Sequence, residues 1–191
     1  QTYRIQYLKD VILENAQDDI ALHTLRTYVM FNGTEIVERL QTEGDFIKAL
    51  TDKLKEGPAL ENHNHFVGQF KAFCALGKTL MNTGAKVALL KSLIFHGAFA
   101  VVGNWLCGDV VQLARDGLEI IRTFSMHVDL VRAAILAQQK GGERSLLQKL
   151  VYCFANTNNL GLVVQSHELI SRILATDEMD AAQSLIKTKM L

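Results

Sequence analysis

The residues with the clearest potential for chemistry are two histidines separated by one residue. His63 and His65 could supply two imidazole ligands to a metal ion. A metal site needs further ligands, yet no cysteine or carboxylate cluster accompanies this pair, and His96 and His127 show no spacing relation to it. The pattern therefore favours a solvated helix start before Phe66, and no metal or cofactor is predicted. A helical hydrolase that uses this pair is the least favoured hypothesis.

The serines and cysteines do not form a recognisable nucleophilic site. No serine lies in a Gly-x-Ser-x-Gly elbow, and Cys74, Cys107 and Cys153 lie far apart within apolar segments. The common glycine-rich phosphate loops are missing as well. Carboxylates cluster at Asp18-Asp19 and Asp177-Glu178, where helices are expected to begin and where negative charge complements the helix dipole. We therefore predict that the chain is not an enzyme.

Helices are predicted to position any functional residues, because apolar residues recur at three- and four-residue spacing along most of the chain. Two such stripes are Phe46, Ile47, Leu50, Leu54 and Val110, Leu113, Ala114, Gly117, Ile121, Phe124. Breaks are expected at Asn32-Gly33-Thr34, Glu56-Gly57-Pro58, Gly141-Gly142 and Asn156-Thr157-Asn158-Asn159. Thr34 and Asn159 are predicted to cap the helices that follow them.

Three glycines mark a repeat in this helical pattern. Gly44, Gly97 and Gly142 are spaced by 53 and 45 residues, and an apolar stripe follows each. A period of about 45 residues is typical of armadillo and HEAT repeats, whose helices bury their apolar faces by stacking. We predict an all-α protein, a right-handed α-solenoid of armadillo/HEAT-like repeats, in which residues 1–191 form a single armadillo-like repeat domain. Because the chain starts at Gln1, we expect it to be a fragment of a longer protein.

A solenoid commonly offers an extended concave groove, lined by the last helix of each repeat, to an extended segment of a partner. The candidate binding residues on the exposed side of those helices are Lys48, Asp52, Asn104, Gln148, Tyr152 and Asn156. Their polar groups could hydrogen-bond a peptide backbone, and Tyr152 adds a face for packing. We predict a peptide- or partner-binding site here, whereas Trp105 is expected to lie in the core.

The composition argues against several classes of partner. The 20 basic residues equal the 20 acidic ones and are dispersed, so no nucleic-acid-binding surface is predicted. No segment reaches about 18 uninterrupted apolar residues, so no membrane contact is predicted. The three cysteines are an odd number and read as reduced core thiols. They favour a location in the nucleus and cytoplasm.

The opening segment Gln1-Thr2-Tyr3-Arg4-Ile5-Gln6-Tyr7, which continues through Leu8-Lys9-Asp10-Val11-Ile12-Leu13, carries a family resemblance. Further matching segments are Met30-Phe31-Asn32-Gly33-Thr34-Glu35-Ile36-Val37, Phe70-Lys71-Ala72-Phe73-Cys74-Ala75-Leu76 and the stretch from Val164 to Leu174. Together they resemble the central armadillo-like domain of the protein phosphatase 4 regulatory subunit 3 family, also known as SMEK or Falafel. The likeness covers nearly the whole chain in the order found in the family.

This resemblance implies a non-catalytic regulatory and scaffold module that targets a serine/threonine phosphatase to its substrates. The implied partners are the phosphatase 4 catalytic subunit, a second regulatory subunit and substrate peptides. The residues themselves leave an alternative open, an armadillo-like transport or adaptor module of another pathway. Binding to phosphatase components distinguishes the two hypotheses.

Overall fold

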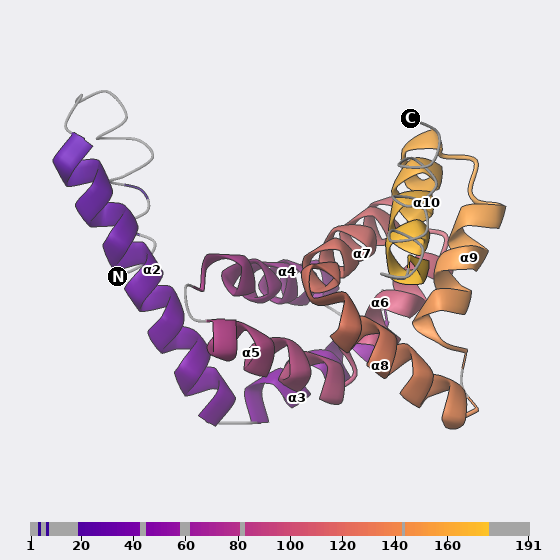
Figure 1. The fold of residues 1–191 in the computed structure, drawn as a ribbon, viewed down its shortest axis with the longest axis horizontal. Coiled ribbons are helices and arrows are strands. Elements are labelled where there is room, and N and C mark those ends of the chain that lie inside the picture. The colour runs from indigo at the N-terminus through magenta and orange to yellow at the C-terminus, as the bar shows by residue number, and fades with distance from the viewer. Residues whose placement is uncertain are drawn as a thin grey trace, which may run out of the picture. The chain divides into compact units, whose positions relative to one another are not determined.

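The computed structural model describes residues 4, 7, 19–42, 45–57, 62–80, 83–142 and 144–175. Over these residues the regular structure is entirely helical, which confirms the predicted all-α class. The α-helices are α2 (Asp19–Thr42), α3 (Asp45–Lys55), α4 (His63–Thr79), α5 (Thr83–Phe95), α6 (Ala98–Cys107), α7 (Val111–Phe124), α8 (Val128–Lys140), α9 (Leu146–Asn156) and α10 (Leu160–Leu174), with a short 3-10 helix, η2 (Ser125–His127), before α8 (Figure 1).

The chain divides into two compact units, Gln1–Ala98 and Phe99–Leu191. Within each unit, helices that are close in sequence pack on one another, as in solenoid-type folds. A single domain over residues 1–191, the armadillo type and the right-handed superhelix stay predictions. Gly44, Pro58, Asp18 and the pair Asp177-Glu178, which the sequence analysis singled out, lie outside the described residues.

In the first unit, the predicted stripe of α3 faces the core. Ile47, Leu50 and Leu54 are buried, and α3 packs on α4. Phe46 stays partly exposed, yet its ring meets Phe73 of α4 edge-on with 6.1 Å between ring centroids. The helix ends before Gly57, whose φ of 91° is a left-handed conformation that glycine adopts without steric cost. The break predicted at this glycine is therefore confirmed.

The break predicted at Asn32-Gly33-Thr34 is wrong, because α2 continues through it. Gly33 and Val37 are buried and lie four residues apart, so they share the face of α2 that packs on α4 and α5. Thr34 does not cap a helix, since its hydroxyl donates to the carbonyl oxygen of Met30, one turn earlier, at 3.1 Å. Burial of one helix face thus overrides the local turn preference of an Asn-Gly pair.

In the second unit, α6 packs unusually close to α7 at Gly117. A Cβ atom on Gly117 would lie 3.3 Å from Cγ1 and 3.5 Å from the carbonyl oxygen of Val102. The stripe predicted on α7 is buried from Leu113 to Phe124, except that Val110 precedes the helix and is exposed. Trp105 of α6 is buried, as predicted.

The two described glycines of the proposed repeat, Gly97 and Gly142, each come before a short helix. Gly97 precedes α6 and Gly142 precedes α9, and their φ angles are 96° and 76°. Helices α3, α6 and α9 have 11, 10 and 11 residues, and each is followed by a longer helix of 17, 14 or 15 residues. The described helices therefore follow a recurrent order of short and longer helices.

Gly117 provides a direct test of the close α6–α7 packing. We expect Gly117→Val to lower the free energy of unfolding by about 1–3 kcal/mol, because the added carbons overlap Val102. The matched control is Gly68→Ala on α4, where a Cβ meets nothing within 4 Å and the higher helix propensity of alanine should stabilise the chain slightly. Chemical denaturation followed by circular dichroism measures both. Equal stability of Gly117→Val and the wild type would contradict this account.

Candidate functional site

The six residues predicted to bind a partner are all exposed and lie on the three short helices. Lys48 and Asp52 are on α3 in the first unit, while Asn104 is on α6, and Gln148, Tyr152 and Asn156 are on α9, in the second unit. The structure brings Tyr152 and Asn156 together at one cavity, which also lies within the second unit. Peptide binding by any of these residues stays a prediction.

On α3, Asp52 forms an ion pair on the helix surface. Its Oδ1 atom lies 2.8 Å from Nζ of Lys55, and this hydrogen bond lowers the pKa of the Asp52 carboxyl. The adjacent cation Lys48 acts in the same direction. Exposed pairs of this kind contribute little to stability. Asp52 is therefore a solvated, ionised group on a surface that otherwise carries lysines.

Asn104 and Gln148 have structural partners in the second unit. Asn104 of α6 accepts a hydrogen bond from Nζ of Lys149 on α9 at 3.0 Å. The amide oxygen of Gln148 accepts from the backbone N–H of Ser145 at 2.9 Å, and the Ser145 hydroxyl accepts from the N–H of Gln148 at 3.4 Å. This reciprocal capping box starts α9. Both predicted binding residues thus help to hold α6 and α9 in place.

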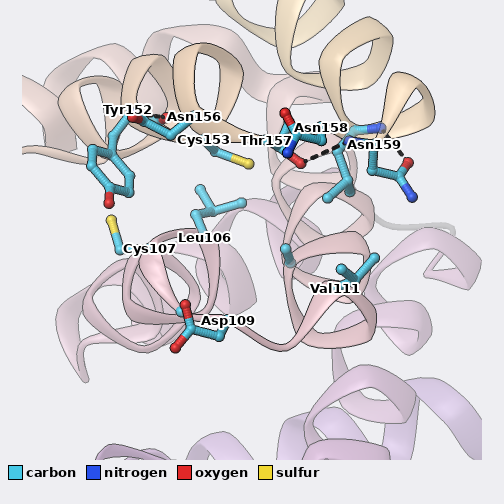
Figure 2. A pocket seen from close by; sticks show the side chains of 13 residues that line it. Leu106, Cys107, Asp109, Val111, Tyr152, Cys153, Asn156, Thr157, Asn158 and Asn159 are labelled. Atoms are coloured by element: carbon cyan, nitrogen blue, oxygen red, sulfur yellow. Dashed lines mark hydrogen bonds between the residues drawn. The ribbon is translucent and has the colours of Figure 1, made fainter.

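A cavity of about 500 Å³ opens where two helix connections meet in the second unit (Figure 2). One side comes from the end of α6, residues 108 and 109 and the start of α7, and the other from the end of α9, residues 157–159 and the start of α10. Thirteen residues line it, namely Leu106, Cys107, Gly108, Asp109, Val111, Ala114, Tyr152, Cys153, Asn156, Thr157, Asn158, Asn159 and Leu162. We call it the α6–α9 pocket.

Hydrogen bonds within the second connection give the α6–α9 pocket a fixed rim. The side chain of Asn159 accepts from the N–H of Leu162 at 3.2 Å, so it caps α10 as predicted. The N–H of Asn159 in turn donates to the hydroxyl of Thr157 at 3.2 Å. One helical turn earlier, the amide nitrogen of Asn156 donates to the carbonyl oxygen of Tyr152 at 2.8 Å. Its amide oxygen makes no hydrogen bond within the part of the chain that the structure describes.

The interior of the α6–α9 pocket holds apolar groups and two thiols. Figure 2 shows Leu106 and Cys153 between the two connections, and the hydroxyl of Tyr152 directed toward Cys107. Cys153 is buried, which raises the pKa of its thiol, and the hydroxyl of Ser166 lies 3.8 Å from its sulfur. Neither thiol belongs to a group of described His, Cys, Asp or Glu side chains that could hold a metal ion.

The first half of this pocket, from Leu106 to Val111, was not predicted from the sequence. A signal was present, because polar turn residues follow both Cys107 and Asn156, at the ends of the two short helices. A second signal was the 45-residue separation between Asn104 and Lys149, which equals the spacing of Gly97 and Gly142. Only the packing of α6 against α9 shows that the two turns face each other.

The histidine pair differs from the expectation of a solvated helix start. His65 is exposed, and its Nε2 atom lies 3.0 Å from the amide nitrogen of Gln69. His63 is only 5% exposed, and neither of its ring nitrogens has a hydrogen-bond partner. The expectation is therefore wrong for His63, which is packed into the first unit at the start of α4. Among the described residues, no group of three or more His, Cys, Asp or Glu side chains could hold a metal ion.

No single described helix is long and apolar enough to cross a bilayer. Helices α5 and α6 reach that length and composition only as a pair that is broken between Phe95 and Ala98.

Comparison with known proteins identifies the class. The model of the phosphatase 4 regulatory subunit 3 family matches residues 1–190, almost the entire chain. The chain therefore belongs to this family, as the resemblance of its opening segment indicated. The family is one of regulatory subunits of a protein phosphatase.

Two relatives show how widely this sequence type is distributed. Suppressor of Mek1 from Dictyostelium discoideum is 26% identical over 183 residues, which cover 95% of this chain and 17% of that protein. An uncharacterized protein from Schizosaccharomyces pombe is 20% identical over 187 residues, covering 92% of this chain and 22% of that protein. The chain thus spans about a fifth of the length of these curated relatives. No solved structure matches it.

The rates at which the three cysteine thiols react test the burial of each thiol in the structure. Burial raises the pKa of the Cys74 thiol to about 12, so at pH 8 almost none of it is the reactive thiolate, and the thiolate fraction grows only as the pH rises toward that value. Cys107 is half-buried at the pocket, whereas Cys153 is buried. We expect iodoacetamide at pH 8 to modify Cys107 first, then Cys153 and finally Cys74, as measured by peptide mass spectrometry.

The control for this labelling order is Cys107→Ser, which should remove the fastest modification and leave the slowest unchanged. Modification of Cys74 as fast as that of Cys107 in the folded chain would show that the described burial is wrong.

Proposed function

We propose that this chain is a non-catalytic scaffold module of a protein phosphatase 4 complex. Its proposed partners are the phosphatase 4 catalytic subunit, a second regulatory subunit and substrate peptides, which it would bring together for dephosphorylation. The observation that carries the proposal is the family match over residues 1–190. The fold agrees with this role, because stacked helices offer exposed surfaces without requiring a catalytic centre.

The α6–α9 pocket is the proposed contact point for a partner. Tyr152 is 44% exposed, so its ring is available to pack against a bound segment while its hydroxyl reaches the cavity. Asn156 offers a free amide oxygen next to it. Tyrosine is among the residue types that most often contribute a large share of the affinity of an interface. We also propose a location in the nucleus and cytoplasm, which the three free cysteines support because free thiols are common in reducing compartments.

The test of this function is capture of phosphatase components. The purified chain should retain the phosphatase 4 catalytic subunit or its second regulatory subunit from a matched cell extract. Tyr152→Ala and Asn156→Ala should reduce the retained amount about fivefold, the loss expected for roughly 1 kcal/mol of interface energy. Quantitative immunoblotting of the retained fraction measures this effect.

The matched control is Leu136→Ala, which truncates an apolar side chain of α8 that is 58% exposed and lies outside the pocket. It should retain both components at the wild-type level. Failure of the folded wild-type chain to retain either component would contradict the scaffold proposal, and retention of another pathway's peptides would favour the transport or adaptor hypothesis.

A further inference from the structure

The α6–α9 pocket is lined by a negatively charged side chain and by no positively charged one. Asp109 is the one charged side chain among the thirteen lining residues, and no lysine or arginine is present there. Within the part of the chain that the structure describes, Asp109 forms no ion pair or hydrogen bond. Its carboxylate is exposed at the rim, on the connection from α6 to α7 (Figure 2). A ligand would therefore meet a negative charge that no described ion pair neutralises.

Two helix ends add to this negative character. Helix α6 ends at Cys107 and α9 ends at Asn156, and both residues line the pocket. The last carbonyl groups of a helix lack intrahelical partners and carry the negative end of the helix dipole. The residues that follow each helix satisfy only some of these carbonyl groups. The N–H of Gly108 donates to the carbonyl oxygen of Trp105, and the N–H of Thr157 donates to the carbonyl oxygen of Cys153.

The last turns of α6 and α9 also differ from those of most described helices. Neither contains a basic residue, and α5 is the one other described α-helix with this property. The basic residues in the last turns of the remaining helices are Arg39, Lys53, Lys55, Lys78, Arg122, Lys140 and Arg172. A cation stabilises a helix C-terminus. Of the two helices that end at the pocket, α6 receives the ammonium group of Lys149, which donates to Asn104 in its last turn, whereas α9 has no basic residue in its own last turn.

The apolar lining residues of the pocket suit the aliphatic part of a lysine or arginine side chain. Leu106, Val111 and Leu162 provide apolar walls against which the methylene groups of lysine or arginine can pack. The free amide oxygen of Asn156 and the hydroxyl of Tyr152 can accept hydrogen bonds from the charged end. A basic side chain thus finds both apolar contact and several acceptors in one cavity.

The same cavity is less suited to binding an anionic ligand. Helices α7 and α10 begin there, and their first N–H groups attract negative charge. At α10, however, the side chain of Asn159 already accepts from the N–H of Leu162. At α7, the carboxylate of Asp109 lies two residues before Val111 and opposes any incoming anion. The balance therefore favours a cation.

From these observations we propose that the α6–α9 pocket binds a lysine or arginine side chain of an extended segment of a partner protein. The proposal deepens the scaffold function proposed above and rests on it, because it specifies the chemistry of the bound segment. Asp109, the open carbonyl groups of α6 and α9, and Asn156 recognise the charged end, while the apolar walls hold its stem.

The test uses three short probes that differ at one residue, acetyl-Gly-Ala-Arg-Ala-Gly-amide and its Gln and Glu counterparts. Each is titrated into the isotope-labelled chain, and binding is followed by the backbone amide signals in two-dimensional NMR spectra. The Arg peptide should produce saturable shifts confined to residues 106–114 and 152–162, and the Gln and Glu peptides should bind more weakly. Asp109→Asn should weaken binding of the Arg peptide about threefold to fivefold, the effect of losing one exposed ion pair.

The matched control is Asp129→Asn, which removes a carboxylate that is 94% exposed on α8 of the same unit and lies outside the pocket. It should leave the affinity for the Arg peptide unchanged. Equal binding of the Arg and Gln peptides, preference for the Glu peptide, or no effect of Asp109→Asn would overturn the proposal. Retention of phosphatase components by a chain that fails this test would preserve the scaffold function while removing the basic-side-chain specificity.

Discussion

The second unit depends on how closely α6 approaches α7. With no side chain at Gly117, the two helices meet through the backbone and Cγ1 of Val102, and the apolar stripe of α7 is buried along its length. This contact determines where α6 ends and α7 begins, and hence where residues 108–110 lie. The edge-on contact of Phe99 with Phe124, 5.3 Å between ring centroids, supports the same helix pair from its other end. The position of Asp109 is thus a consequence of core packing more than of its own interactions.

The binding properties proposed for the pocket arise from helix ends more than from individual side chains. The two short helices of the second unit, α6 and α9, each end at a connection of three residues, and these two connections face each other across the cavity. Partial negative charges of backbone carbonyl groups therefore lie beside the apolar and polar side chains of the same lining. In a repeat protein this geometry recurs wherever equivalent helices end side by side. The side chains of each connection would then determine which ligand each such site binds.

Much of the fold follows from the order of apolar residues, and the exceptions have a common cause. The stripes of α3 and α7, the turns at Gly57 and at Gly141-Gly142, and the Asn159 cap depend on neighbours within a few residues, so local rules predict them. The Asn32-Gly33 pair and His63 were misjudged because their environment is set by helices distant in sequence. For the pocket, the residues of α9 were identified from helix periodicity. Those from Leu106 to Val111 were not, because their relevance depends on the contact of α6 with α9.

The hydrogen bond between Lys149 and Asn104 has a consequence for sequence variation in the family. The aliphatic part of Lys149 lies over Gly103, where a Cβ atom would come within 2.5 Å of its Cδ. Any side chain at position 103 would displace the lysine from Asn104, although the helical backbone itself does not require glycine there. The residues at positions 103, 104 and 149 are therefore expected to vary together. Family members that have a larger residue at position 103 should also have a shorter or uncharged one at position 149.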